Sequence, residues 1–312
     1  MTPDAPTTML VDTASLYFRA FFGVPSTMRA ADGTPTNAIR GLLDFISRLV
    51  GTHAPARIAC CWDDDWRPAW RVGLVPGYKQ HRQSEAGDGS EQVPDDLAVQ
   101  VPVIRQVLAA LGLAVVGAPG CEADDVIGTL SASAPGPVDV VTGDRDLFQL
   151  VDDERAVRVL YTAKAGVGRA EIIDDTAVRT RYGVPAAGYA DFATLRGDTS
   201  DGLPGVRGVG DKTAASLITE YGDLDGVLAA SADPASRLSP TLRRRILDAA
   251  DYLDRARRVV LVRRDADLPV QPVELAVPTA PADPAAWADL VEAYELGSSA
   301  QRVEAVLAGR SA

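Results

Sequence analysis

The feature that most constrains the fold of this chain is an alternation of short apolar runs with longer segments of helical period. Five runs have the β-branched and apolar character of buried strands: TMLVDTA at 8–14, RIACCWDDD at 57–65, AVVGAP at 114–119, VDVVTGD at 138–144 and VRVLYT at 157–162. Three segments between them carry apolar residues at helical spacing, at 36–50, 96–112 and 122–133. This alternation predicts an α/β domain with a mainly parallel central sheet flanked by helices.

The second half of the chain has a different character. From about residue 176 the strand signals fade, and short helical segments with Gly and Pro breaks take over. The stretch 269–284 is rich in Pro and Ala, so we expect it to be extended and packed over the surface, before a last amphipathic piece at 285–296. The predicted organisation is an α/β domain over 1–175, a helical subdomain over 176–264 and a C-terminal extension over 265–312 that packs on the body.

The composition predicts a globular, cytoplasmic protein. With 312 residues, 46% of them hydrophobic, the chain can bury a substantial core. No apolar run approaches the roughly 18 residues of a membrane span, and the start of the chain does not read as a signal peptide. The three cysteines, Cys60, Cys61 and Cys121, have no Cys-x-x-Cys spacing and are interpreted as small buried hydrophobic residues.

Acidic side chains follow three of the predicted strands. Asp12 ends the first run, Asp63 the second and Asp144 the fourth. Because the carboxyl ends of parallel strands share one edge, where ligands bind in a crevice, these carboxylates should meet there. More acids lie close by in the sequence: Glu122, Asp124 and Asp125 where a loop enters a helix, and Asp146 two residues past Asp144.

Two explanations of these acids stay open. Acids at a helix start act as caps and are favoured by the helix dipole, by a few tenths to about 1 kcal/mol, which alone accounts for Asp124 and Asp125. Several carboxylates on one edge, however, raise one another's pKa and oppose folding. Mg²⁺ or Mn²⁺ would remove this conflict, because hard cations prefer oxygen ligands, and two ions about 3.5 to 4 Å apart could activate a water for phosphodiester cleavage.

The net charge restricts the class of nucleic-acid binder. A charge of -12, from 43 acids against 31 bases, argues against binding through a simple basic patch. Two or three divalent ions would cancel about four to six negative charges at the site that faces a substrate. With only two histidines, His53 and His81, a Ser-His-Asp machine has little to draw on, so acid–base chemistry should run through carboxylates and metal-bound water.

A basic stretch, PGYKQHR at 76–82, is the next candidate. Tyr78 offers an aromatic face for stacking an unpaired base, and Lys79 and Arg82, three apart, would share one helix face and could polarise a scissile phosphate. The alternative is an ordinary exposed helix start with cations that extend into water. The polar, Gly-rich segment 83–96 that follows suggests a mobile arch that orders on substrate, and a plain disordered loop is equally consistent.

The stretch GVRGVGDKTAASLI at 205–218 indicates a helix-hairpin-helix. Gly208 and Gly210 free the backbone for a tight turn, and Lys212 and Thr213 start a helix whose N–H groups face outward. Such a turn grips duplex phosphates without reading bases, although a Gly-rich helix start alone is more often a packing feature. Two further acids, Asp198 and Asp201, lie about ten residues before it.

Six strings together resemble the bacterial 5′ nuclease family, which comprises flap endonucleases and the 5′-to-3′ exonuclease domain of DNA polymerase I. They are LVDTASLYFRAFF, CWDDDWRPAWR, GYKQHR, GCEADDVIG, TGDRDLFQLV and GDTSDGLPGVRGVGDKTAASL, in order from about residue 9 to 260. The resemblance implies a 5′ nuclease (PIN-like) fold with a helical arch near 76–100 and a helix-hairpin-helix near 203–220. It places the family's metal-binding acids on Asp12, Asp63, Glu122, Asp124, Asp125, Asp144, Asp146, Asp198 and Asp201.

The same resemblance implies further roles and ligands. Lys79 and Arg82 would act at the scissile phosphate, and DNA would be contacted by Tyr78, Arg19, Gly208, Gly210, Lys212 and Thr213. It implies two or three Mg²⁺ or Mn²⁺ ions, and K⁺ at the hairpin. The expected substrate is DNA with 5′ flaps, nicks or 5′ ends, and the expected form is a free-standing monomer that works with DNA polymerase or ligase.

The function predicted is therefore that of a metal-dependent, structure-specific 5′ nuclease in DNA replication and repair. Two alternatives remain. A PIN-like ribonuclease shares the carboxylates at the sheet edge but needs neither arch nor hairpin, and a non-catalytic DNA-junction binder would keep the hairpin without needing nine acids. The sequence leaves the balance of flap endonuclease and exonuclease activity open.

Overall fold

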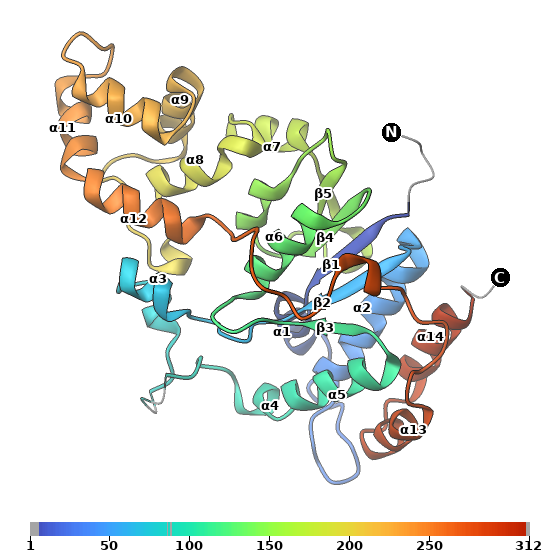
Figure 1. Cartoon of the computed structure of the whole chain (residues 1–312). Helices are drawn as coiled ribbons and strands as arrows, with labels where there is room; N and C mark the ends of the chain where they lie inside the picture. Colours follow the sequence, from blue (N-terminus) through green and yellow to red (C-terminus); the bar gives the residue numbers. More distant parts are fainter. Residues whose placement is uncertain (1–5, 86, 88, 310–312) are drawn as a thin grey trace.

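The fold is built on one six-stranded sheet. The computed structural model describes residues 6–85, 87 and 89–309. The strands are β1 (Thr8–Asp12), β2 (Arg57–Cys61), β3 (Ala114–Val116), β4 (Val138–Thr142), β5 (Val157–Tyr161) and β6 (Glu171–Ile173). Their order is β3-β2-β1-β4-β5-β6, and all neighbours are parallel except β5 and β6 (Figure 1). The predicted mainly parallel sheet is confirmed, and the antiparallel β6 is an addition that its three residues are too short to signal.

The sheet separates two hydrophobic cores, because side chains alternate across a strand. In β1, Met9 and Val11 belong to one core and Leu10 to the other, and all three are fully buried. The first core lies against α1 (Thr13–Gly23), α2 (Asn37–His53) and α5 (Val101–Leu111), whereas α6 (Ala123–Ser133) packs in the second. The three cysteines are buried as predicted, in these cores.

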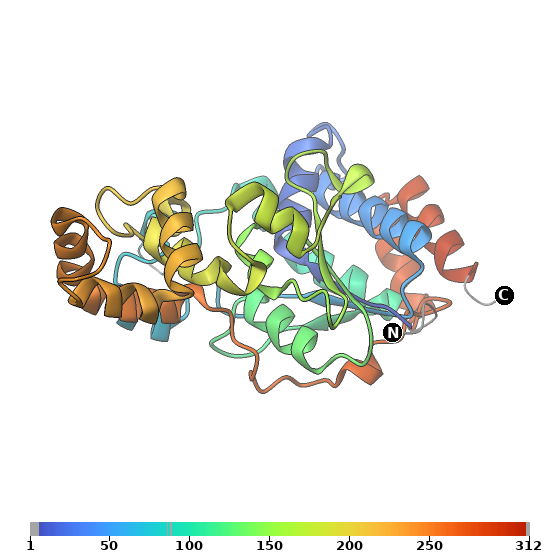
Figure 2. The same cartoon turned by 90° about the horizontal axis from the view of Figure 1, so that it is seen from above.

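Of the next six helices after β6, α7 (Asp175–Tyr182) lies beside the sheet, and the other five form a unit that extends to one end of the molecule (Figures 1 and 2). These five are α8 (Tyr189–Arg196), α9 (Asp211–Tyr221), α10 (Leu224–Ala232), α11 (Pro240–Asp248) and α12 (Ala250–Val260). The last of these, α12, packs on α8 and on the short helix α3 (Ala69–Leu74) of the first domain. The remaining short helices are α4 (Asp95–Ala98) and the 3₁₀ turns η1 (Gln80–Arg82), η2 (Asp146–Leu150), η3 (Val167–Arg169), η4 (Ala186–Gly188), η5 (Thr199–Asp201) and η6 (Pro272–Glu274).

After α12 the chain returns across the body as an extended strap, residues 261–283 (Figure 1). The strap lies directly on α6, since the backbone oxygen of Arg263 is 2.4 Å from the place where a Cβ on Gly128 would stand. Farther along, the N–H of Ile58 donates to the carbonyl of Leu275 over 2.8 Å, beside the edge of the sheet. The extended surface segment expected here is therefore present.

Two helices close the described chain. They are α13 (Pro284–Ala293) and α14 (Gly297–Ala308), and α14 packs along α2. The last helix predicted from the sequence ends at residue 296, so α14 is not predicted. Its buried face consists of small or isolated apolar residues, such as Ala300 and Val303, that give only a weak periodic signal.

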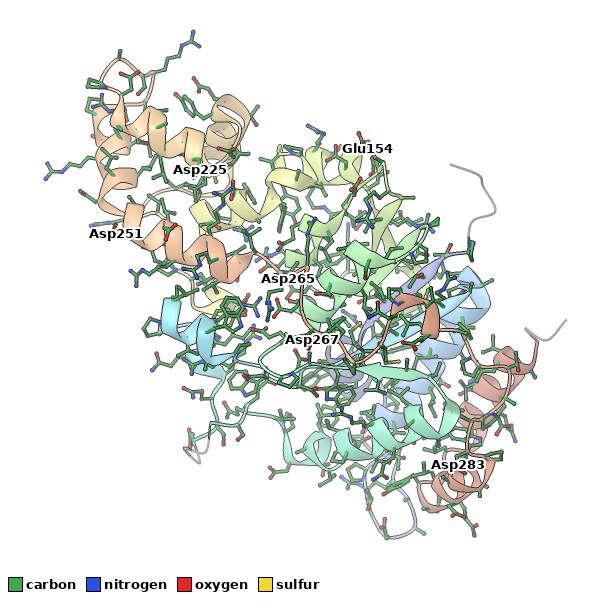
Figure 3. The ribbon with its side chains drawn as sticks, in the orientation of Figure 1. Glu154, Asp225, Asp251, Asp265, Asp267 and Asp283 are labelled. Carbon is green, nitrogen blue, oxygen red and sulfur yellow. The ribbon has the colours of Figure 1, made fainter. Side chains whose placement is uncertain are left out.

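Acids away from the sheet edge are spread over separate elements. Figure 3 labels Glu154 before β5, Asp225 on α10, Asp251 on α12, Asp265 and Asp267 on the strap and Asp283 before α13, all of them exposed. Some have local partners: Asp225 pairs with Arg257 over 2.9 Å. Within the described residues, no helix combines the length and the apolar character needed to cross a bilayer.

Candidate active site

The carboxyl ends of the strands frame one polar cavity. The strand order reverses between β1 and β4, which is where open α/β sheets place their ligands. A cavity of about 410 Å³ lies at this edge. It is lined by Asp12, Ala14, Ser15, Phe18, Asp63, Trp66, Lys79, Arg82, Glu91, Glu122, Ala123, Asp124, Gly143, Asp144, Arg145, Tyr161 and Ser200. The predicted convergence of acids from β1, β2, β4 and the start of α6 is thus present in the structure.

Asp12 is held at the centre of this edge by two donors. Its Oδ1 accepts the N–H of Ser15 over 3.0 Å, which caps α1, and its Oδ2 accepts the hydroxyl of Thr142 over 2.6 Å. The Thr142 oxygen in turn accepts the N–H of Asp144 over 2.8 Å. Burial, reinforced by the nearby Asp63 and Asp144, outweighs these donors and raises the pKa of Asp12 to about 7.

Asp63 and Glu122 lie at the start of α6. Asp63 accepts the N–H of Ala123 over 2.8 Å, so a strand-end carboxylate caps the helix that carries the next acids. Glu122 is 2% exposed and accepts from the Tyr78 hydroxyl over 2.8 Å, while its other oxygen pairs with the ammonium of Lys79. Burial raises the pKa of both carboxyls.

Asp125 differs from its neighbours because it faces away from the cavity. Arg71 grips its two oxygens with two hydrogen bonds of 2.7 Å, and the backbone N–H groups of Arg263 and Glu122 donate to it over 2.9 and 3.2 Å. Its side chain is fully buried and does not line the cavity. The oxygens of Asp125 thus accept from four donors in this structure, and its role as an ion ligand stays a prediction.

Asp124 and Asp146 have the opposite character. In the described part of the chain no hydrogen-bond donor to Asp124 is found, and burial together with Asp144 and Asp12 raises its pKa well above the usual range. Asp146 follows β4, and its Oδ1 is buried without a hydrogen-bond partner. Burial, then Asp144, Asp201 and Asp198, raises the pKa of Asp146 in the same way.

Asp198 and Asp201 approach this group from the turn η5. Asp198 accepts from the N–H and hydroxyl of Ser200 and pairs with Arg145 and Arg196 over 3.2 and 3.3 Å. Burial acts to raise the pKa of Asp198, but these donors together lower it. Asp201 pairs with Arg82 over 3.0 Å, and burial raises its pKa.

The basic stretch departs from its predicted form. Lys79 has a left-handed backbone with φ of 47°, and Arg82 ends a single 3₁₀ turn, so the two do not share a helix face. Tyr78 is 4% exposed, with its ring between the cations of Lys79 and Arg71 at 5.2 and 6.0 Å. The stacking face expected of Tyr78 is therefore absent, because its hydroxyl is drawn inward to Glu122.

The predicted arch begins as a short hairpin in the residues that the structure describes. Gln83 bridges to Glu91, and the N–H of Gln92 donates to the carbonyl of Arg82 over 2.7 Å. The indole of Trp66 donates to the carbonyl of Gly89 over 3.3 Å. Residues 86 and 88 of the expected arch lie outside the described residues.

The hairpin before α9 is present, and Gly208 and Gly210 have different backbone conformations in it. Gly208 has φ of 78° and supplies the left-handed turn, against which the guanidinium of Arg245 packs. Gly210 has an extended backbone with φ of -105°, and a Cβ there would meet nothing within 4 Å. Of these two glycines, only Gly208 is required by the backbone of the turn, while the place of a side chain at Gly210 is open space just before Lys212 and Thr213 at the start of α9.

Arg19 lies on α1 beside the cavity. Its Nε is buried without a hydrogen-bond partner, and its Nη2 is 3.8 Å from where a Cβ on Gly143 would stand. The DNA-contacting role that the resemblance implies for Arg19 stays a prediction.

Three arginines at this edge, Arg71, Arg145 and Arg196, are not predicted as site residues from the sequence. Arg71 is 2% exposed, and besides Asp125 it bonds Glu122 over 3.2 Å and the carbonyl of Val259 at the end of α12 over 3.1 Å. Arg145 and Arg196, which hold Asp198, are missed as well. Arg71 stands within the quoted string CWDDDWRPAWR, but a lone arginine there looks like a surface residue until its partners, more than 50 positions away, are known.

The donor set fits hard cations better than it fits the bases that now neutralise it. Among the described residues, Asp146 has a buried carboxylate oxygen without a hydrogen-bond partner, and the half-buried Asp124 lies beside like charges. Among the described residues, no three acidic, histidine or cysteine side chains stand close enough to hold an ion as they are. The basic partners account for this, because Lys79 draws Glu122, and Arg82 draws Asp201, toward themselves.

Comparison with known proteins gives agreement over most of the chain. The model for the 5′-3′ exonuclease N-terminal resolvase-like domain matches residues 7–183, and that for the 5′-3′ exonuclease C-terminal SAM fold matches residues 184–283. A 5′-3′ exonuclease from Streptomyces coelicolor is 58% identical, over 95% of this chain and 98% of its own length. A DNA polymerase I from Mycobacterium bovis is 44% identical, over 70% of this chain and 23% of its own length.

A solved structure shares the fold. The flap endonuclease of bacteriophage T5, crystallised with DNA and metal ions, superposes with a TM-score of 0.64 at 15% identity, covering 97% of this chain and 99% of that one. At this identity the match shows the fold alone.

The adjacent acids Asp124 and Asp125 provide a matched pair of substitutions. Asp124→Asn should raise the Tm of the ion-free protein, because a desolvated charge repelled by its neighbours is removed, and should weaken Mn²⁺ binding at least tenfold. Asp125→Asn should lower stability by about 3 kcal/mol, because Arg71 loses a buried partner. Thermal unfolding and calorimetric Mn²⁺ titration check both. The same effect from both substitutions would contradict the different surroundings described for them.

Stability should also depend on pH and on divalent ions together. The pKa of Asp12 rises on folding to about 7, so burial of its charge costs the ion-free protein stability progressively as the pH rises toward and through that value. Mn²⁺ should therefore raise the Tm more at pH 8 than at pH 5.5, because at the lower pH protons compete for the same oxygens. Thermal scans with Mn²⁺ and with KCl of equal ionic strength measure this. An equal rise at both pH values would contradict the raised pKa.

Proposed function

The chain belongs to the 5′-3′ exonuclease family, and from that premise we propose that it is a metal-dependent nuclease that cuts DNA at 5′ flaps, nicks and 5′ ends during replication and repair. The observation that carries the proposal is the set of carboxylates that converge at the sheet edge, where no hydrogen-bond donor to Asp124 or to the buried Oδ1 of Asp146 is found among the described residues. Oxygen donors that repel one another are suited to Mg²⁺ or Mn²⁺, which also accept phosphate oxygens as ligands.

The proposal divides the carboxylates into two groups, one around each ion. Asp12, Asp124 and Asp144 face the cavity and are the proposed holders of the ion nearest the reacting phosphate, with Asp63 and Glu122 around them. Asp146 and Asp201, with Asp198 beside them, are the proposed holders of a second ion. The chemistry supplied by ions bound there is activation of a water and stabilisation of the leaving oxygen.

Lys79 and Arg82 are proposed to exchange partners when DNA binds. In the ion-free protein they neutralise Glu122 and Asp201. Both also line the cavity, so once the acids have other counter-charges the two cations are free to turn to the scissile phosphate. This exchange keeps charge balanced in both states, and it explains why basic residues stand among the acids.

The hairpin is proposed to hold the duplex behind the cleavage point. The exposed backbone at Gly210, with the cation of Lys212 next to it, suits a phosphate group, and K⁺ at this turn is part of the proposal. We also propose a monomer that acts with DNA polymerase or ligase, and the division into regions 1–175, 176–264 and 265–312 stays a prediction. The hairpin favours DNA as the substrate over RNA, because a PIN-like ribonuclease does not need it.

Cleavage assays separate this function from its alternatives. The protein should cut a 5′-flap DNA with Mg²⁺ or Mn²⁺ and not with EDTA, and Asp146→Asn should lower the rate by at least about 100-fold while flap binding stays within a few-fold, because an ion-holding oxygen is lost and the hairpin residues are unchanged. A preference for single-stranded RNA would favour the ribonuclease. Flap binding without cleavage in either metal would favour the junction binder.

The hairpin gives a second test, in Asp146→Asn protein so that DNA stays intact. Lys212→Ala should weaken the binding of substrates that contain a duplex. It should also reduce the slope of log affinity against log salt by about one, as expected for one lost phosphate contact. Gly210→Val should also weaken duplex binding without lowering the Tm, because a side chain there meets only open space. Binding to a flap and to a matched single strand across a salt series measures both. Equal losses on the two substrates would remove the hairpin as the duplex anchor.

A further inference from the structure

The acidic cavity has an aromatic wall that the proposed chemistry does not use. Of the residues that line it, Phe18, Trp66 and Tyr161 carry rings. Phe18 stacks on Tyr17 at 5.3 Å, and Tyr161 packs edge-on against Phe148 at 5.1 Å. In the described part of the chain Trp66 has no aromatic partner. Its half-buried ring lines the same cavity as the carboxylates and, among the described residues, forms no interaction with them that would explain its position.

The position of Trp66 is fixed from two sides. Its indole N–H donates to Gly89 in the arch hairpin over 3.3 Å. The next residue, Arg67, is anchored to the base of the arch by hydrogen bonds to the carbonyls of Pro76, over 2.8 Å, and Tyr78. Both limbs of the arch therefore orient Trp66 before any ligand arrives, which lowers the entropy cost of binding.

We propose that Trp66 is a stacking platform for an unpaired nucleobase next to the phosphate at which the chain cuts. The carboxylates of the same cavity are the proposed site of that phosphate, so the attached base must lie nearby. A base has a flat apolar face that the acids cannot satisfy and that an indole can, whatever the base identity. Tyr78, the residue expected in this role, is buried against Glu122 and cannot provide it.

This inference rests on the proposed function, and its test uses abasic DNA. In Asp146→Asn protein, Trp66→Leu and Trp66→Phe both lose the hydrogen bond to Gly89, but only Phe keeps a ring. Trp66→Leu should weaken binding of an intact 5′ flap by about 5- to 100-fold. It should have little effect when the nucleotide beside the cleavage point lacks its base. Trp66→Phe should fall between Trp66→Leu and the parent on the intact flap.

The outcomes distinguish the two levels of the proposal. If Trp66→Leu weakens the binding of intact and abasic flaps equally, or weakens the binding of neither, the stacking role is wrong, while the proposed recognition of flaps is unaffected. If the parent protein binds no flap at all, the proposed function fails and the stacking role fails with it. Thermal unfolding of each variant shows whether the arch contact, rather than the base, accounts for a loss.

Discussion

The mutual repulsion of carboxylates at one sheet edge is the constraint on which the rest of the site depends. The parallel sheet brings the ends of β1, β2 and β4 together, and the acids placed there cannot all ionise without counter-charges. In the structure the counter-charges are Arg71, Lys79, Arg82, Arg145 and Arg196, each paired with an acid of this edge. Among the described residues, the acids of this edge without a basic partner are Asp12, Asp63, Asp124, Asp144 and Asp146, and they mark where further positive charge is needed.

The buried pair of Arg71 and Asp125 ties this edge to the rest of the molecule. Arg71 belongs to α3 at the base of the arch, Asp125 to the first turn of α6, and the Arg71 side chain also bonds the end of α12. The strap adds a fourth segment through the N–H of Arg263. The helical unit that carries the hairpin is thereby in direct contact with the first turn of α6, the helix that carries Asp124.

The sequence predicts this architecture well where the signal is local. The apolar runs predict the five parallel strands, and the position of Asp12, Asp63 and Asp144 after those runs predicts the shared edge, because strand ends in a parallel sheet must meet. The family resemblance is confirmed over residues 7–283. The sequence does not show the contacts that tertiary partners decide. Tyr78 turns inward because Glu122 lies within reach of its hydroxyl, and Asp125 pairs with Arg71, which is more than 50 positions away. The sequence also misses β6 and α14, which are too short or too weakly patterned to be recognised.

The central claim is that divalent ions bind the carboxylates of this edge that have no basic partner, and that Lys79 then releases Glu122. Anomalous diffraction from crystals grown with Mn²⁺ tests it most directly. The account predicts one peak bounded by Asp12, Asp124 and Asp144, a second beside Asp146, and the Lys79 ammonium moved away from Glu122. Crystals that bind Mn²⁺ elsewhere, or leave this edge empty with the Lys79–Glu122 pair intact at saturating Mn²⁺, would contradict it.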